Sequence, residues 1–211
     1  MANTAVLNQF GIIPIDTAAL KAALDDYKSP KDKITTLEQS GLLIRLKRGL
    51  FVVSPMVHSQ PLSKELIANH IYGPSYISLQ TALSFYGLIP ERVHTVCSMT
   101  TKRSSSFINP LGNFDYITVP AAYFAIGIRQ EIVNNNYAYL IATPEKALCD
   151  MIVETKGLKL QSIKAMQNYL EEDLRIDLSV IEHYDIDIIN QCIELGSKKR
   201  ELTLLYKLLK G

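Results

Sequence analysis

Residues 1–55 show a helical pattern of apolar positions that gives way to an extended one. Apolar residues at helical spacing predict short helices over residues 3–10, 16–24 and 30–40, and a glycine follows the first and the third of them. Two short apolar runs, 42–47 and 50–53, then flank a basic turn that contains glycine, which predicts a β-hairpin. Three short helices followed by a hairpin are the order of elements in a winged helix-turn-helix.

After this segment the pattern mixes helices and strands. A stretch with Pro61 and several polar residues separates the two parts, so we expect a winged helix-turn-helix DNA-binding domain at 1–58 and a larger domain at 59–211. The pattern of the second part predicts helices at 64–71, 78–86 and from 143 onward, and strands at 93–100, 113–119 and 137–142. The predicted fold class is therefore α+β, with a small sheet and C-terminal helices in the larger domain.

The composition is that of a globular protein. Of 211 residues, 47% are hydrophobic and 20% are charged, which supplies a core and excludes disorder along the whole chain. No run approaches the roughly 18 apolar residues of a membrane-spanning helix, and we expect neither a signal peptide nor a membrane partner. The three cysteines lie far apart without a CxxC motif, so we expect a cytoplasmic protein without structural zinc or a disulfide framework.

The net charge of +1 is the sum of oppositely charged blocks. Residues 21–48 carry seven basic and four acidic side chains, whereas residues 171–187 carry seven acidic side chains and one arginine. Residues 197–210 carry five basic side chains and one acidic one. Separate charged blocks indicate separate surfaces. We expect the basic tail to pair with the acidic block of the same chain, although an external partner is the alternative.

The third predicted helix has the pattern of a recognition helix. If Ile34 and Leu37 are buried, Asp32 and short polar side chains lie on the opposite face, with lysines at its margins. Asp32 fits this role less well, because it would approach the phosphates. In the hairpin, basic residues alternate with apolar ones, which predicts one cationic strand face. The expected DNA-binding residues are Lys31, Lys33, Thr35, Thr36, Gln39, Arg45, Lys47 and Arg48. The alternative is an ordinary solvated helix, which is also polar on one side.

The sequence offers little for catalysis. His94 and Cys97 would lie on opposite faces of a strand, and the four histidines have no metal-ligand spacing. Asp115 with a later Glu145-Lys146 pair is similar to a metal-dependent nuclease, but those two residues are adjacent and open a helix. We therefore expect a protein that is not an enzyme, with no catalytic residue, metal or cofactor.

Two stretches of the larger part resemble a known family. The first is YISLQTALSFYGLIPERV, residues 76–93, and the second is ATPEKALCD, residues 142–150. Together with the predicted winged helix, they resemble the AbiEi family of abortive-infection antitoxins and predicted transcriptional regulators in bacterial phage-defence loci. The matching positions are Tyr76, Ser78, Tyr86, Gly87, Glu91, Arg92, Thr143, Pro144, Glu145 and Lys146, and RGLF at 48–51 is similar to the family's wing turn. The acidic pair Asp25-Asp26 departs from the family pattern.

The resemblance implies a two-part function. The winged helix would bind DNA near the protein's own promoter, and the larger domain would counteract a nucleotidyltransferase-type toxin without a stable complex being required. The candidate residues for the antitoxin role are Arg92, Lys102, Arg103, Glu145 and Lys146. The alternative is a non-catalytic module that binds a protein or RNA and carries a vestigial winged helix.

Overall fold

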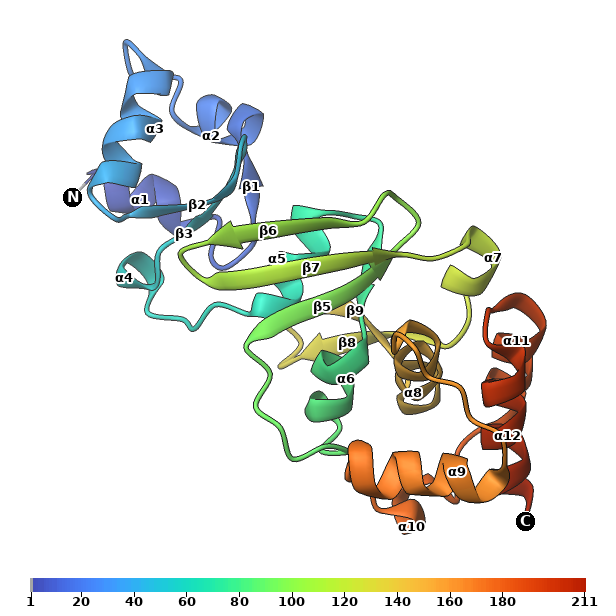
Figure 1. Ribbon diagram of the computed structural model, residues 1–211. Coiled ribbons are helices and arrows are strands. Elements are labelled where there is room, and N and C mark those ends of the chain that lie inside the picture. Colours follow the sequence, from blue (N-terminus) through green and yellow to red (C-terminus); the bar gives the residue numbers. More distant parts are fainter. Residues whose placement is uncertain (1) are drawn as a thin grey trace.

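A computed structural model describes residues 2–211, which form two connected units of mixed α+β structure (Figure 1). The N-terminal unit surrounds an antiparallel sheet with the strand order β1-β3-β2. Its helices are α1 (Ala2–Asn8), α2 (Thr17–Ala23), α3 (Pro30–Gln39) and α4 (Pro55–His58), and its strands are β1 (Ile15–Asp16), β2 (Leu43–Lys47) and β3 (Leu50–Val53).

Local signals explain where these elements begin and end. The Asp16 carboxylate accepts a hydrogen bond from the backbone N–H of Ala19 at 2.7 Å and caps α2. Pro30 occupies the first turn of α3, where its missing N–H costs nothing. The β2–β3 turn contains Gly49 at φ +81°, a backbone conformation that suits glycine. Apolar side chains of these elements form a small core: Leu7, Ile15, Leu20, Leu24, Ile34, Leu37, Leu43, Phe51 and Val53.

The larger unit is built on a mixed sheet with the strand order β6-β7-β5-β4-β9-β8. Its strands are β4 (Ser75–Ile77), β5 (Thr95–Thr100), β6 (Ser105–Asn109), β7 (Gly112–Thr118), β8 (Ile128–Val133) and β9 (Tyr137–Ala142). Its helices are α5 (Lys64–Ile71), α6 (Leu79–Phe85), α7 (Ala121–Phe124), α8 (Pro144–Glu154), α9 (Ile163–Asn168), α10 (Leu178–Ile181), α11 (Ile186–Leu195) and α12 (Lys199–Lys210), and a π-helical turn at Tyr169–Asp173 follows α9.

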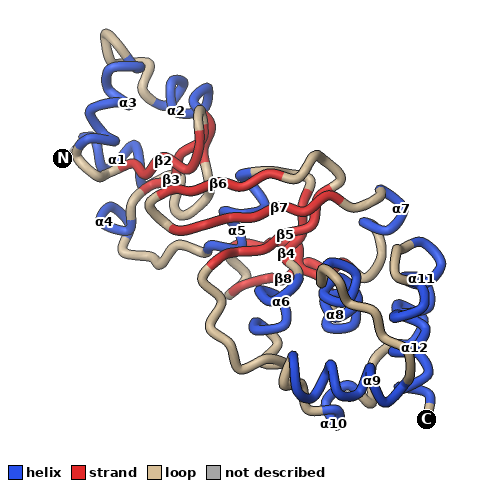
Figure 2. The backbone as a smooth tube through the Cα atoms, viewed as in Figure 1, coloured by secondary structure: helices blue, strands red, loops and turns tan. Residues whose placement is uncertain are grey.

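Helices cover the larger sheet unevenly. Helix α5 packs behind β5 and β7, where the hydroxyl of Tyr116 donates to the carbonyl of Ala68 at 2.6 Å (Figure 1). Helices α6 and α8 lie on the opposite side, and α9 to α12 gather at the end remote from the N-terminal unit (Figure 2). Among the described residues, no helix combines the length and apolarity needed to cross a membrane.

The β2–β3 hairpin joins the two units. Its Leu46 and Val52 side chains are buried in the core of the larger unit, together with Ile67 and Ile71 of α5. The ammonium of Lys47 donates to the carbonyl of Ile71 at 2.5 Å. The amide of Asn109 in β6 donates to the carbonyl of Leu46 at 3.2 Å. The hairpin therefore packs against a hydrophobic core on each of its faces.

The predicted α+β class is confirmed, and so are the helix at 64–71 and the strand at 137–142. The pattern missed β4, β6 and β8. Strand β4 has only three residues, the Ser-rich start of β6 reads as a loop, and β8 is an edge strand with many polar residues.

The expected ion pairs between the basic tail and the acidic block are absent among residues 2–211. The ammonium of Lys198 instead donates to the carbonyl of Ile152 at 3.0 Å and to that of Thr155. Arg200 donates to the side chain of Gln161. The last carbonyls of a helix have no partner within it, so α8 recruits the lysine.

The junction yields a test of stability. Leu46→Ala should lower the free energy of unfolding by about 2–5 kcal/mol, because it leaves a cavity where the hairpin meets α5. Chemical denaturation followed by circular dichroism measures this change. Met56→Ala, at a side chain that is 78% exposed, should change the same quantity by less than about 0.5 kcal/mol. Equal stability of Leu46→Ala and the wild type would contradict the two-sided packing of the hairpin.

Candidate nucleic-acid interface

Helix α3 presents the polar face that the sequence predicts. Ile34 and Leu37 are buried, whereas Thr35, Thr36 and Gln39 are exposed. The hydroxyls of Thr35 and Thr36 donate to backbone carbonyls one turn earlier, at 3.3 and 3.0 Å, which fixes the rotamer of each side chain. Because these three side chains are exposed, an external ligand can reach this face.

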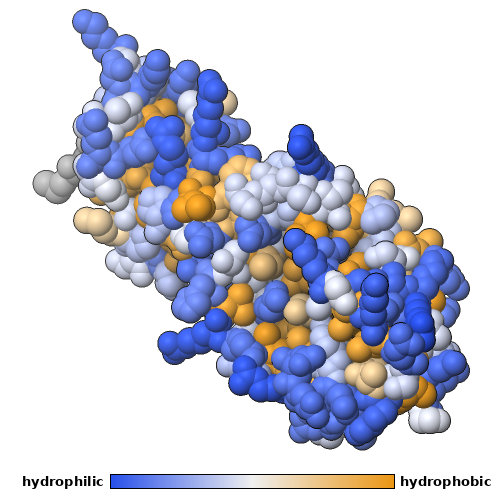
Figure 3. Space-filling view, viewed as in Figure 1, coloured by the Kyte–Doolittle hydropathy of each residue, from blue (hydrophilic) through white to orange (hydrophobic). Residues whose placement is uncertain are grey.

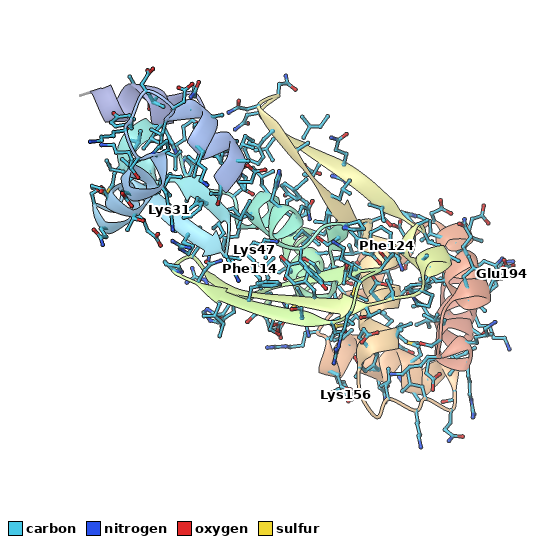
Figure 4. The ribbon with its side chains drawn as sticks, turned by 90° about the horizontal axis from the view of Figure 1, so that it is seen from above. Lys31, Lys47, Phe114, Phe124, Lys156 and Glu194 are labelled. Carbon is cyan, nitrogen blue, oxygen red and sulfur yellow. The ribbon has the colours of Figure 1, made fainter. Side chains whose placement is uncertain are left out.

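The lysines beside this face differ in their surroundings. Lys31 is exposed at the start of α3 and lies out on the N-terminal unit (Figure 4). Lys33 is half-buried, and its ammonium lies 4.7 Å from the ring centre of Tyr27. A cation over an aromatic face is already partly stabilised. Lys31 is therefore the freer of the two to meet a phosphate.

The prediction that β2 presents one cationic face is wrong. A β-bulge lies between Arg45 and Lys47, so the strict alternation of faces stops there. Arg45 instead donates to both carboxylate oxygens of Glu38 in α3, at 2.7 and 2.5 Å, and lies 4.9 Å from the ring centre of Phe51. The Arg45 guanidinium lowers the pKa of Glu38 below its ordinary value. Lys47 lies at the junction with the larger unit, bound to Ile71 (Figure 4).

Arg48 is the exposed cation of the hairpin turn. The turn is fixed beside the start of α2, because the backbone N–H of Thr17 donates to the carbonyl of Gly49 at 3.0 Å. Of the predicted DNA-binding cations, Lys31 and Arg48 thus remain exposed without an ion pair or side-chain hydrogen bond to the described residues. Arg45 is neutralised in place, and Lys47 is turned inward.

The two stretches that carry the family resemblance meet inside the larger unit. Lys146 and Asp150 of α8 form an ion pair of 2.8 Å in which both side chains are fully buried. The second oxygen of Asp150 accepts from the hydroxyl of Ser78 at 2.6 Å and from that of Tyr76 at 3.0 Å. Burial and the Asp150 carboxylate raise the pKa of Tyr76 far above its ordinary value, so this hydroxyl stays protonated and donates.

Two further residues enclose the ion pair. The ammonium of Lys146 lies 3.1 Å from the ring centre of Tyr123 in α7, a cation–π contact. Gly127, at φ +55°, approaches Lys146 so closely that an added Cβ would lie 2.8 Å from the Cβ of the lysine. The ion pair thus connects α8, β4, α7 and the start of β8.

This arrangement corrects the interpretation of several candidate residues. Lys146 is fully buried, so it cannot contact a partner. Ser78, at the start of α6, makes no capping hydrogen bond to that helix, because its hydroxyl donates to Asp150. Glu145 is half-buried and accepts from the backbone N–H of Asp185 at 3.2 Å.

The remaining antitoxin candidates do not form one cluster. Arg92, Lys102 and Arg103 are all exposed, but the six-residue strand β5, about 20 Å long, separates the first from the other two. The ammonium of Lys102 lies 5.3 Å from the ring centre of Tyr72, whose hydroxyl donates to the carbonyl of Arg103. These three candidates therefore belong to two separate surfaces, with Arg92 on one and Lys102 and Arg103 on the other.

Asp150 and Tyr123 were not predicted as site residues. The signal for Asp150 was a lysine and an aspartate four residues apart on a helix whose other face is apolar. No sequence signal pointed to Tyr123, because its partner Lys146 lies 23 positions away. Within residues 2–211 no group of three or more His, Cys, Asp or Glu side chains is placed to hold a metal ion.

No family model matches the sequence, and no curated protein matches it either.

The buried ion pair yields a second test. Lys146→Met should lower the free energy of unfolding by about 3–5 kcal/mol, because it leaves the Asp150 charge buried without its cation. The double variant Lys146→Met/Asp150→Asn should recover part of the loss, since both charges are gone and the asparagine oxygen still accepts from Ser78. Urea denaturation measures the wild type, Lys146→Met, Asp150→Asn and the double variant. Lys159→Met, at an exposed position, is the control. A double variant less stable than either single variant would contradict the mutual neutralisation of the pair.

Proposed function

We propose that the protein is a cytoplasmic, DNA-binding transcriptional autoregulator and the antitoxin of an abortive-infection type toxin-antitoxin pair. In this proposal the N-terminal unit acts as a winged helix-turn-helix, and α3 enters the major groove of the DNA near the protein's own promoter. The observation that carries the proposal is the exposed polar face of α3, on a helix whose opposite face is anchored by Ile34 and Leu37.

The side chains on α3 suit base recognition. The amide of Gln39 can bind adenine through two hydrogen bonds, and threonine methyl groups can contact the methyl group of thymine. Because the hydroxyls of Thr35 and Thr36 bond to their own helix, each threonine holds a fixed orientation before DNA arrives. These residues would supply specificity, and the exposed cations would supply affinity.

Few cations are free for phosphates, which sets an expected limit on affinity. Glu38 neutralises Arg45, Lys47 binds the larger unit, and Asp32 lies exposed on the same helix as the polar face. Lys31 and Arg48 then provide the phosphate contacts. A small number of phosphate contacts gives a shallow salt dependence.

The antitoxin part of the proposal rests on the resemblance of residues 76–93 and 142–150 to AbiEi proteins. Support comes from the packing of these stretches: Tyr76 and Ser78 of the first bind Asp150 of the second. Residues that recur together in a family and meet in one buried cluster have a shared structural reason to recur. The larger unit would then counteract a nucleotidyltransferase-type toxin through its surface, with Arg92, Lys102, Arg103 and Glu145 as the candidates.

DNA binding is tested with duplex from the region upstream of the protein's own gene. Lys31→Ala/Arg48→Ala should make the slope of log K against log salt shallower by about 1.8, because each lost phosphate contact removes roughly 0.9. Gln39→Ala should weaken specific binding by about 1–3 kcal/mol without changing the slope. Fluorescence anisotropy over a salt series measures both quantities.

The control in this experiment is Lys47→Ala, whose ammonium binds Ile71 rather than solvent. It should leave the salt slope unchanged. If neither the wild type nor the variants bind duplex DNA, the proposal fails, and the alternative of a module that binds protein or RNA replaces it.

The antitoxin role is tested separately in growing cells. The full chain, expressed from an unrelated promoter, should restore growth to cells that produce a nucleotidyltransferase-type toxin encoded beside it. Lys31→Ala/Arg48→Ala should restore growth equally, because the proposed antitoxin surface lies on the larger unit. Continued arrest with the wild-type chain would contradict the antitoxin role, and rescue lost only in the variant would show that it requires DNA binding.

A further inference from the structure

A cavity of about 720 Å³ opens on the face of the larger sheet that α5 leaves uncovered. Strands β5, β6 and β7 form its floor, and the start of α6 and the end of α8 form its walls. The corresponding face of the molecule shows apolar surface framed by hydrophilic side chains (Figure 3). Cavities of roughly 300–1,000 Å³ are the size that holds small-molecule ligands.

A row of polar side chains crosses the floor. Asp115 of β7 is the register partner of Cys97 in β5 and of Ser106 in β6. Paired residues on neighbouring strands point to the same face, so these three side chains lie side by side in the cavity. The neighbouring residues Phe114 and Tyr116 point the other way, into the core.

Several polar groups in the cavity have no internal partner. No hydrogen bond or ion pair joins the side chains of Asp115, Ser106 or Gln80 to any other residue in the described part of the chain. Asp115 and Gln80 are both half-buried. A partly buried carboxylate without a counter-ion is costly, and a ligand that supplies one is favoured.

The charges in the cavity favour a cation. Its lining contains two carboxylates, Asp115 and Glu154, and one exposed ammonium, Lys156. Burial raises the pKa of Glu154. Lys198 and Lys156 offset part of this effect at Glu154. Burial, and to a smaller extent the negative charge of Asp115, raises the pKa of Cys97 to about 11. Asp115 has no cation hydrogen-bonded or ion-paired to it among the described residues.

Part of the lining is apolar. Leu79, Ile117 and Met151 contribute side chains from three different elements. An inorganic ion would leave most of this volume and apolar surface unfilled. A cationic group on a hydrocarbon chain would pair with the Asp115 carboxylate and also cover the apolar lining. We propose that the cavity binds an organic cation, a guanidinium or primary amine on an apolar chain, with Asp115 as counter-ion and Gln80 and Ser106 as hydrogen-bond partners.

The buried ion pair keeps the walls of this cavity in place. The wall residues Leu79 and Met151 directly follow Ser78 and Asp150 in the sequence. The hydroxyl of Ser78 donates to the carboxylate of Asp150 at 2.6 Å. The distance between α6 and α8 is therefore set without a ligand, so the site is pre-formed. The inference uses no residue of the N-terminal unit and does not depend on DNA binding.

The test compares two ligands of matched shape. n-Butylguanidinium carries the proposed charge, and n-butylurea replaces its cationic group by a neutral one. Titration followed by nuclear magnetic resonance of the full chain should show millimolar or tighter binding of the guanidinium, with the largest shifts at residues around the cavity. The urea should bind at least about tenfold more weakly, because it lacks the charge that Asp115 attracts.

Two variants locate the binding. Asp115→Asn should weaken binding of n-butylguanidinium at least about tenfold, since it keeps the shape of the side chain and removes its charge. Asp25→Asn, an exposed aspartate of the N-terminal unit, is the matched control and should leave binding unchanged. Circular dichroism confirms that both variants are folded.

Cys97 supplies an independent readout. It is half-buried in the cavity, whereas Cys149 and Cys192 are buried elsewhere, so iodoacetamide at about pH 9 should modify Cys97 first. n-Butylguanidinium should slow this modification in the wild type and fail to slow it in Asp115→Asn, with each rate compared to that of the same protein without ligand.

A short peptide with a single arginine provides the second source of the same chemistry. Tighter binding of the peptide identifies a basic side chain of a partner as the natural ligand, and tighter binding of the small molecule identifies a free metabolite. The proposal is overturned if neither cation binds, if n-butylurea binds as tightly as n-butylguanidinium, or if Asp115→Asn binds as the wild type does.

Discussion

The buried ion pair of Lys146 and Asp150 constrains the whole larger unit. Two charges removed from water cost several kcal/mol each, and only good geometry with further hydrogen bonds offsets this cost. Asp150 receives donors from Lys146, Ser78 and Tyr76, and the ring of Tyr123 covers the ammonium. The two residues lie one turn apart on α8, so another packing of this helix would keep the pair but remove the hydroxyls of Ser78 and Tyr76 and the ring of Tyr123 from it. The pair therefore favours a single arrangement of α8, β4 and α7.

The hairpin of the N-terminal unit is constrained in a different way, by apolar contacts on both faces. Phe51 and Val53 belong to the small core, whereas Leu46 and Val52 belong to the large one. Ordinary strand alternation sends Val52 to one core and its neighbours Phe51 and Val53 to the other. In β2, the bulge between Arg45 and Lys47 accompanies contacts of both Leu46 and Lys47 with the larger unit. Two basic residues of the hairpin therefore make internal contacts: Lys47 binds α5, and Arg45 forms an ion pair with Glu38 of α3.

The sequence predicts best where one local pattern decides the structure. The faces of α3 follow from the spacing of Ile34 and Leu37, and the α5 and β9 segments follow from their apolar periodicity. The sequence predicts poorly where contacts with residues far away in the chain determine the local structure. The bulge after Arg45 lies where Leu46 and Lys47 contact the larger unit, and the charge of the buried Lys146 is matched by Tyr123 and Asp150. A lysine in the first turn of a helix reads as exposed until its tertiary neighbours are known.

The junction also has an entropic consequence for any partner of α3. Two domains joined by a flexible linker must give up rotational freedom when both engage a common assembly, which weakens association. Here Lys47, Asn109 and the shared apolar contacts at Leu46 already fix the angle between the units. A partner that spans both units would meet a rigid surface and lose little affinity to ordering. A partner that required another angle would have to break these contacts first.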